Sequence, residues 1–585
     1  MGLENGNRGS ARLSRRGLIR GGLVIGGGLA GAALIGCSST SKPAPSGGSS
    51  TPAASSTQAT SREGVPVAKG TPKDGGTWTE AVSLTSPQQD MHTALAQSIW
   101  HNISERAFQP DPWTGELKAS LVEKWETPDS TTIVMHVKKG VLIHDKAPWS
   151  GREFDAEDLA FNINRIAGNT AEAEGIQKTQ FQRADTLAGM SKVEVVDKHT
   201  VKVTMARPSS AYLMGFLEWR NVMMPKGIVE VGFKDPMKFA SFGAYQMSEF
   251  VPDVRETFVK HPKYYRQGEP HIEKFQHTVV GDRAAALAGF ISKQFSILAS
   301  PTPQEEQTVK AARPDAMLYS TAGNQWLYLW PSANSEALKD FRVRKAMQLA
   351  INYQEMGSFY GTSFEYTSPV FSGFVEGWKP EKIKTLAGYN PATKAKDLTD
   401  ALALLSAAGR AEGEGIAFPI LTPTGTGIFA AHNEDAIRFQ AQMQKAFPKS
   451  KITVNGVADR AQFAATQAAR RFDMLSYSSI PQPAAASEAY SLFHSKGGRN
   501  YGNFSNPEAD SLLEKAQQEL DAKARTQIFE TFQQKWFSEW MPLFALYVEP
   551  KKAFIQPNIS GYENMVGPWS QGLSFHRRGL LSLTA

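Results

Sequence analysis

The chain has 585 residues, 41% of them hydrophobic and 10% aromatic, with 63 basic and 57 acidic side chains. A chain of this length exceeds what a single hydrophobic core supports, so we expect more than one core. The small, dispersed basic excess argues against a nucleic-acid partner, which would require a concentrated basic face. The single cysteine, Cys37, excludes disulfides within the chain and zinc clusters of the cysteine type.

Residues 1–36 have the pattern of an export signal. The pair Arg15 and Arg16 forms a twin-arginine pattern, and a glycine-rich apolar run over Gly21–Gly36 follows it. This run is shorter than the roughly 20 apolar residues of a membrane-spanning helix. A basic patch, an apolar stretch, a small residue and then Cys37 resemble a bacterial lipoprotein signal. We therefore expect twin-arginine export and a lipid on Cys37 that holds the protein at the outer face of the cytoplasmic membrane. The alternative is a plain N-terminal anchor with a chance cysteine.

Residues 37–74 are rich in serine, threonine, proline, alanine and glycine and contain few aliphatic side chains. Such a segment buries too little apolar area to offset its ordering entropy. We expect a disordered tether that spans roughly 35 Å on average. Without the five arginines and one glutamate of residues 1–36, the remaining chain has 58 basic and 56 acidic side chains, a net charge of +2.

Strand and helix signals alternate from Gly75 onward. Residues 132–137 alternate in period two and predict a strand, and residues 193–196 and 201–205 predict a hairpin. A helix should begin after Asp155, which can cap it, and end before Gly168.

Further elements follow in the second half of the chain. Val343, Met347 and Ile351 have the spacing of a buried helix face, and Asn506 followed by proline and glutamate marks another helix start. The mixed order of strands and helices indicates an α/β or α+β architecture.

Several stretches, in this order along the chain, resemble the large solute-binding proteins of ABC importers for peptides, nickel and related solutes (family 5, dipeptide/oligopeptide-binding-like). The similarity extends from about residue 75 to 575. The stretches are LVEKWE at 121–126, DAEDLAF at 155–161, FGAY at 242–245, HPKYY at 261–265, FRVRKA at 341–346, YGNFSNPE at 501–508 and MPLF at 541–544.

The resemblance implies an α/β, two-lobed clamshell of the periplasmic-binding-protein type (type II, the large peptide-binding subclass with an extra subdomain). Lobe I would comprise residues 75–323 and 551–585, with an inserted subdomain at about 110–240, and lobe II residues 324–550. The chain would cross between the lobes near Gly323 and Pro550. It further implies a monomer that has no enzymatic activity and no cofactor. This monomer would capture a solute in the cleft and deliver it to permease and ATPase subunits.

Catalytic signatures are weak in this sequence. HExxH, GxSxG and the phosphate-binding Gly-x4-Gly-Lys motif are missing, and the eleven histidines are scattered. His144-Asp145 is adjacent in sequence and favours a structural role, and His261, His271 and His277 lie in a scaffold segment of the family pattern, which argues against a metal site there. The glycine motif at 425–430 follows a predicted strand, but the next strand lacks the acid that a dinucleotide site requires. We expect neither metal nor cofactor. An exported hydrolase on a similar scaffold, or an oligosaccharide-binding sensor without transport, remains open.

Aromatic walls with a few fixed polar groups are typical of clefts that hold large solutes. The candidates come from the N-terminal segment, from the strand after the first predicted crossing, and from loops that resemble cleft loops of the family. They are His92, Trp100, Asn102, Trp149, Trp326, Tyr328, Phe371, Trp378, Tyr477 and Gln482. Ordinary packing in a core is the alternative for each.

Peptide-binding members of the family usually carry an acid that holds the terminal ammonium of the peptide. The matching stretch here is 477–483, where Ile480 or Gln482 occupies the place of the acid. An uncompensated ammonium in a closed cleft is costly. This argues against free-amine peptides as the solute. We expect an aromatic, uncharged cleft, which a neutral oligosaccharide, a blocked peptide or another amphiphilic solute fits at least as well.

Overall fold

The computed structural model describes residues 65–83, 85, 89–93, 99–181, 183–361, 363–425, 428–570 and 577–584. The predicted export signal with Arg15, Arg16 and Cys37 lies outside these residues, as does most of the predicted tether. Within the described ranges no helix has both the length and the apolar character to cross a membrane.

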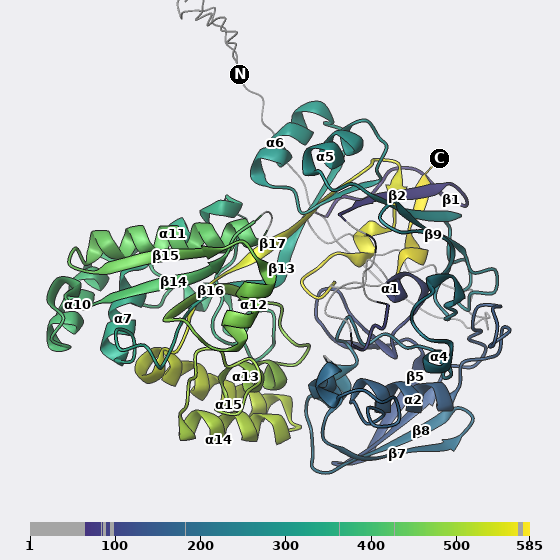
Figure 1. The fold of residues 1–585 in the computed structure, drawn as a ribbon, viewed down its shortest axis with the longest axis horizontal. Helices are drawn as coiled ribbons and strands as arrows, with labels where there is room; N and C mark the ends of the chain where they lie inside the picture. The colour runs from purple at the N-terminus through teal and green to yellow at the C-terminus, as the bar shows by residue number, and fades with distance from the viewer. Residues whose placement is uncertain are drawn as a thin grey trace, which may run out of the picture. The chain divides into compact units, whose positions relative to one another are not determined.

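A ten-stranded mixed sheet connects the two halves of the folded body. Its order is β15-β14-β16-β13-β17-β12-β2-β11-β10-β9. The long antiparallel strands β13 and β17 lie at its middle and run from one half to the other (Figure 1). The strands are β2 Thr77–Val82, β9 Tyr245–Val251, β10 Arg255–Lys260, β11 Lys274–Val279, β12 Ile297–Ala299, β13 Met317–Pro331, β14 Ala417–Pro423, β15 Lys451–Val457, β16 Met474–Ser479 and β17 Phe544–Ile555.

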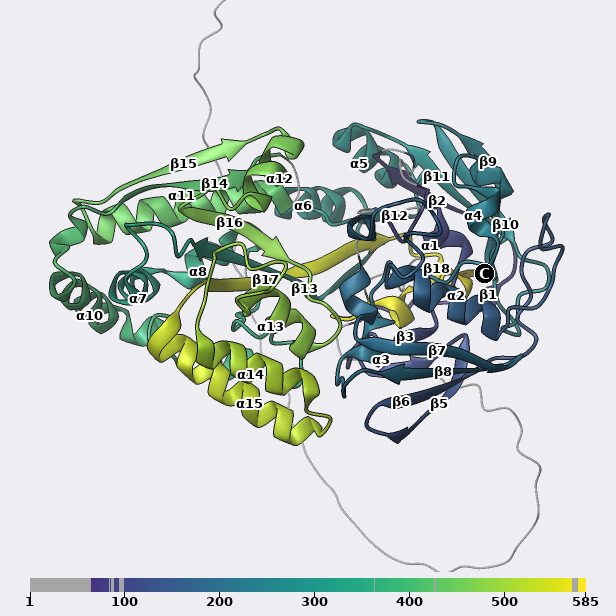
Figure 2. The same cartoon turned by 60° about the horizontal axis from the view of Figure 1, so that its bottom comes forward.

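A separate antiparallel sheet of order β5-β6-β8-β7 lies inside the predicted insertion, with helix α2 packed against it (Figure 2). Its strands are β5 Val122–Asp129, β6 Thr132–Val137, β7 Met190–Asp197 and β8 Thr200–Met205. The predicted strand and hairpin are confirmed. Helix α2 spans Ala156–Ile166, and Asp155 caps it through a capping box with Asp158, as the spacing of polar groups requires.

Helices surround the sheet in the second half of the chain. The helix predicted from Val343, Met347 and Ile351 is α7, Phe341–Ala350, with Ile351 as its C-cap, and Asn506 caps α14, Pro507–Gln518. The remaining helices of this half are α8 Tyr353–Met356, α9 Pro380–Ile383, α10 Lys394–Ala407, α11 Ile428–Ala446, α12 Arg460–Ala468, α13 Ala485–Phe493 and α15 Ala522–Lys535, the last continuing into a π-helical turn at Trp536–Trp540.

The first half and the C-terminus contribute short elements around their part of the sheet. These are α1 Trp100–Ile103, α3 Tyr212–Gly215, α4 Ile228–Val231, α5 Arg283–Ile291, α6 Pro303–Ala312, β1 Pro72–Lys73, β3 Phe108–Pro110, β4 Leu117–Ala119, β18 Ile559–Ser560 and β19 Ser582–Thr584. Strand β1 pairs with β19, so ordered structure begins before Gly75, inside the stretch predicted to be a tether.

Two large hydrophobic cores divide the chain close to Gly323 and Pro550. The first core draws on residues 78–319 and 553–581, and the second on residues 326–548 together with Trp569. A small cluster under α5 and α6 adds to the first half. We call the parts built on these cores the first lobe and the second lobe. The predicted α/β, two-lobed fold is confirmed.

Candidate functional site

The register between the two long strands shifts where the chain passes between the lobes. Ala322 pairs with Pro550 and Trp326 pairs with Val548, so the three residues between them on β13 lie opposite Glu549 alone. This arrangement is a β-bulge, which bends a strand and redirects side chains. Gly323 permits it, because a Cβ at that position would lie 2.4 Å from the Glu549 carbonyl oxygen.

A cavity of about 310 Å³ opens at this bulge, and we call it the junction cavity. Its volume lies at the low end of the range of small-ligand pockets. Residues of both lobes form its walls. They are Ser300, Pro301, Thr302, Pro303, Gly323, Asn324, Gln325, Phe359, Tyr360, Ile428, Ile480, Glu549, Pro550, Lys551 and Lys552.

Glu549 is a half-buried carboxylate in the wall of the junction cavity. The Tyr360 hydroxyl, from the 3-10 turn Gly357–Tyr360, donates a hydrogen bond to its Oε2 at 2.9 Å. Burial raises the pKa of Glu549 to about 7, although the Tyr360 hydrogen bond and the nearby Lys551 ammonium partly oppose that shift. Near neutral pH this carboxyl therefore exchanges readily between its charged and neutral forms.

Two lysines follow Glu549 on β17. The Lys551 ammonium donates to the Ser570 hydroxyl at 2.8 Å, and Lys552 forms an ion pair with Glu306 at 2.8 Å. Burial lowers the pKa of Lys551 to about 8. The junction cavity thus has a carboxylate and ammonium groups in its wall, and the expectation of an uncharged cleft is wrong for this part of the structure.

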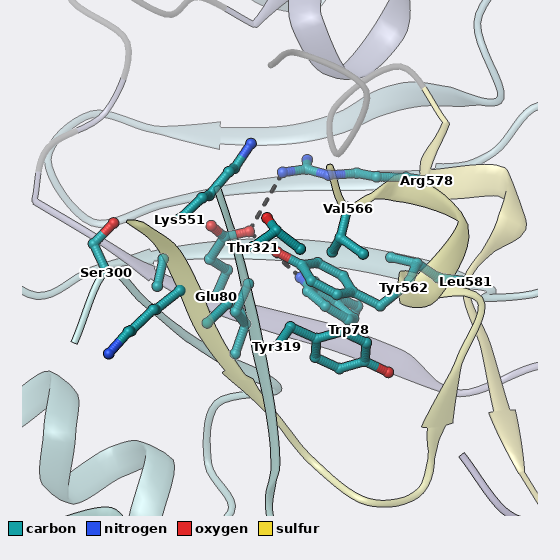
Figure 3. A pocket seen from close by; sticks show the side chains of 14 residues that line it. Trp78, Glu80, Ser300, Tyr319, Thr321, Lys551, Tyr562, Val566, Arg578 and Leu581 are labelled. Atoms are coloured by element: carbon teal, nitrogen blue, oxygen red, sulfur yellow. Dashed lines mark hydrogen bonds and ion pairs between the residues drawn. The ribbon is translucent and has the colours of Figure 1, made fainter. Parts of the chain in front are cut away.

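Lys551 and Lys552 also line a second cavity of about 180 Å³, which we call the C-terminal cavity (Figure 3). Arg578 extends across it toward Glu80, at 3.3 Å, and its guanidinium lies 3.6 Å from the centre of the Phe275 ring. Because Arg578 is paired and stacked in this way, it stabilises the first lobe around the C-terminal segment.

The lobes also touch away from the crossing strands. The Gln482 amide donates to Asp185 at 2.6 Å, and the Ser210 backbone N–H donates to the Gln517 carbonyl at 2.9 Å. Trp569 bridges the lobes, because its backbone N–H donates to the Pro112 carbonyl at 2.9 Å while its ring packs against Phe371. These contacts place Trp569 in the second core, although it lies in the segment predicted for lobe I.

Comparison with known proteins identifies the family. Residues 91–501 match the family model described as bacterial extracellular solute-binding proteins, family 5 middle. The chain belongs to this family. It is therefore a solute-binding protein that acts outside the cytoplasm, and it is not an enzyme.

Curated relatives include the peptide transport periplasmic protein SapA of Salmonella typhimurium, which is 22% identical over 77% of this chain and 82% of its own length. The glutathione-binding protein GsiB of the same species is 22% identical over 81% of this chain and 88% of its own length. Among solved structures, a putative peptide-binding protein AppA from Clostridium difficile superposes with a TM-score of 0.72 at 19% identity, over 87% of this chain and all of the other.

A second structure, DppA from Helicobacter pylori in complex with the peptide STSA, superposes with a TM-score of 0.70 at 16% identity. The match covers 88% of this chain and 99% of that protein. At these identities the superpositions establish the fold alone.

The predicted ligand residues of the first lobe lie in its core. His92 is buried with Nε2 at 3.0 Å from the Val222 carbonyl, and Trp100 stacks on Phe239. The remaining two also have partners within the protein: Asn102 accepts from Arg578, and Trp149 donates to the Lys226 carbonyl at 2.8 Å.

The predicted residues of the second lobe pack in a similar way. Trp326, Tyr328 and Phe371 are buried in the second core. Trp378 stacks on Phe537, and Tyr477 packs against His432 and Phe463. Gln482 is the exception, since it makes the lobe-to-lobe contact with Asp185. Among the described residues, none of these predicted positions lines the junction cavity or the C-terminal cavity.

Sequence reasoning did not single out Tyr360, Glu549 and Lys551, which line the junction cavity. One signal was present: the run LYVEPKK at 546–552 places charges directly beside the predicted crossing at Pro550. The stretch at 477–483 indicated the position of the junction cavity better than the ten predicted ligand residues did, because Ile480 lines that cavity.

The alternative chemistry has little support in the described residues. No group of three or more metal-ligating side chains occurs among them. His144 is buried, with Nε2 at 3.2 Å from the Gly243 carbonyl and Nδ1 accepting from the Ser241 N–H at 3.1 Å, which is a structural arrangement. In the glycine motif, Gly425 lies between β14 and α11, and residues 426 and 427 lie outside the described ranges.

Proposed function

We propose that this protein is the solute-binding subunit of an ABC importer and that it captures a peptide-like solute in the junction cavity. In this proposal it delivers the solute, as a monomer, to permease and ATPase subunits. The family match over residues 91–501 supports the class of function. The observation that supports the place is a cavity whose walls come from both lobes at the bulge between β13 and β17.

The choice of a peptide-like solute rests on the relatives. Their names mention peptide transport, di- and tripeptides and glutathione, and one similar structure holds the peptide STSA. The junction cavity has polar groups at its crossing-strand side and apolar walls from Phe359, Ile428 and Ile480. Such a combination suits a small amphiphilic molecule that has both a polar backbone and apolar side chains.

Closure of the lobes would be a shift between open and closed populations. A hinge needs a few residues that absorb backbone rotation. The bulge residues Gly323–Gln325 fit this role, because the register of β13 against β17 shifts at this point of the strand. A solute that contacts both walls of the cavity would favour the closed form.

Export and anchoring belong to the same proposal. Arg15 and Arg16 would direct the chain to the twin-arginine route, and Cys37 would carry the lipid. Arg15→Lys together with Arg16→Lys should stop export, and unchanged export would remove that part of the proposal. Mass spectrometry of the mature N-terminus should find a lipid-modified Cys37, and an unmodified thiol would contradict the anchor.

A thermal-shift screen of the purified protein against peptides, oligosaccharides and metal chelates tests the solute class. A ligand at 100 times its dissociation constant should stabilise the fold by about 2.7 kcal/mol. We expect stabilisation by peptides. Stabilisation by oligosaccharides alone would favour a sugar-binding sensor, and turnover of a stabilising compound would favour a hydrolase.

A further inference from the structure

We propose that Glu549 is a cation-recognition residue of the junction cavity, so that the solute presents a positively charged nitrogen, an ammonium or a guanidinium, to this carboxylate. This inference rests on the proposed function and adds the chemical class of the solute.

The backbone explains why Glu549 faces the cavity. It is the single β17 residue opposite the three-residue bulge of β13, between the pairs Ala322–Pro550 and Trp326–Val548. The four consecutive residues from Glu549 to Lys552 all line the junction cavity, and Tyr360 lines it from the second lobe.

The neighbouring charges leave the Glu549 carboxylate incompletely compensated. Among the described residues, the hydroxyl of Tyr360 is its one side-chain donor. The Lys551 ammonium is directed to Ser570 and forms no ion pair with Glu549 in the described part of the chain. Lys552 is held by Glu306. The second carboxylate oxygen of Glu549 is thus open to a ligand.

Two other acids on neighbouring elements either have a partner within the protein or lie outside the cavity. Asp435, on α11, accepts from the Tyr547 hydroxyl at 2.9 Å. Glu365 makes backbone hydrogen bonds with Val548, but its side chain is exposed and does not line the cavity. Glu549 is therefore the acid that a solute would meet in the wall of the junction cavity.

The cavity environment makes the interaction selective. Phe359, Ile428, Pro301 and Ile480 supply apolar wall, and closure over a solute would remove water from the carboxylate. A desolvated carboxylate without a partner is costly, whereas a charged hydrogen bond relieves that cost. A solute with a blocked amine would leave Glu549 without this partner and should bind more weakly.

The test uses two tripeptide libraries without lysine and arginine, one with free amino termini and one N-acetylated. Equilibrium dialysis against the purified protein, with mass spectrometry of the bound fraction, gives relative affinities. We expect the free-amine peptides to bind the natural protein about 10- to 100-fold more tightly than the acetylated ones. Glu549→Gln should remove this difference. Glu365→Gln, which removes a charge next to the same strand outside the cavity, should leave it intact.

An acetylated library that contains lysine distinguishes an N-terminal from a side-chain ammonium, and binding restored in that library supports the inference with the side chain as the source. A proton released on binding, seen as a dependence of calorimetric heat on the buffer, provides support that does not depend on any variant folding. Equal binding of free and acetylated peptides would overturn the inference while leaving the proposed function in place. Failure of every library to bind would overturn both.

Discussion

Charged groups that are shielded from water have more partners within the protein in the first lobe than at the junction between the lobes. Inside the first lobe, the fully buried Arg165 donates to both oxygens of Asp90 at 2.8 and 2.6 Å and to both oxygens of Glu174 at 3.0 and 2.9 Å. Its guanidinium also lies over the Phe181 ring. At the junction, Glu549 has a single hydroxyl donor among the described residues.

A fully buried acid of the first lobe, Glu105, strengthens this contrast. Glu105 accepts hydrogen bonds from both Tyr264 and Tyr265 and forms an ion pair with Arg266 at 3.4 Å. Groups of this kind are saturated by the protein and hold the fold together. A carboxylate with an open oxygen in a cavity is instead prepared for a partner from outside. We propose that this difference distinguishes charged groups that hold the fold together from a charged group that binds the solute.

The largest effect should follow from breaking the saturated cluster. Arg165→Met leaves the Asp90 and Glu174 side chains, which are 18% and 10% exposed, without their largely buried cation partner, and removal of one partner of a buried ion pair typically costs about 3–5 kcal/mol. The free energy of unfolding from urea titrations, followed by circular dichroism, measures this. A loss below about 1 kcal/mol would mean that the cluster does not carry structural charge in the way described here.

A smaller loss should follow from Gly323→Ala. The added methyl group would lie 2.4 Å from the Glu549 carbonyl oxygen, so β13 and β17 must separate at the bulge. Overpacking of this kind costs about 1–3 kcal/mol. Gly281→Ala is the matched control, because a Cβ there meets no atom within 4 Å. Equal stability of the two variants would show that the close approach at the crossing is unimportant.

The pH dependence of stability should report on Glu549. The unfolded carboxyl loses its proton near 4.5, whereas the folded one keeps it to about 7. The folded state therefore binds more protons in this interval, and its stability falls as pH rises through it.

Glu549→Gln removes this contribution, so the variant should gain roughly 1–2 kcal/mol relative to the natural protein between pH 5 and 7.5, after allowance for partial exposure. Lys551, whose pKa is lowered to about 8, adds an opposite dependence above that interval. Parallel stability curves for the two proteins between pH 5 and 7.5 would contradict the assignment.

The smallest effect should follow from Gln482→Ala. Its amide donates to Asp185 across the lobes at 2.6 Å, at a partly exposed position. We expect a change of about 0.5–1.5 kcal/mol or less in unfolding free energy and a small-angle scattering profile shifted toward the open form. A large loss of stability would show that this contact is structural and does not merely bias closure.

Local patterns predicted the architecture well. Asp155, Gly168 and Asn506 mark helix ends through backbone chemistry that needs no tertiary information, and the structure has helix boundaries at those residues. The crossing near Gly323 was also accessible, because a strand signal resumes after a glycine there. The order of the family stretches then led to the prediction of a two-lobed fold.

The site residues were not predictable in the same way. Trp326 and Tyr328 are aromatic, as residues of a cleft wall often are. Helices cover their part of the sheet, however, so both side chains are buried in the second core. Sequence does not show which strand faces are covered. Glu549 faces the cavity because the bulge changes the pairing of its strand, and a bulge of a few residues leaves no periodic signal.

The most direct measurement is a crystal structure of the protein with a bound peptide selected from the free-amine library. We predict that the solute lies in the junction cavity with its cationic nitrogen at hydrogen-bond distance, about 2.7–3.2 Å, from a Glu549 carboxylate oxygen. A peptide bound elsewhere, or one whose charged nitrogen contacts other groups while Glu549 keeps only Tyr360, would contradict the account.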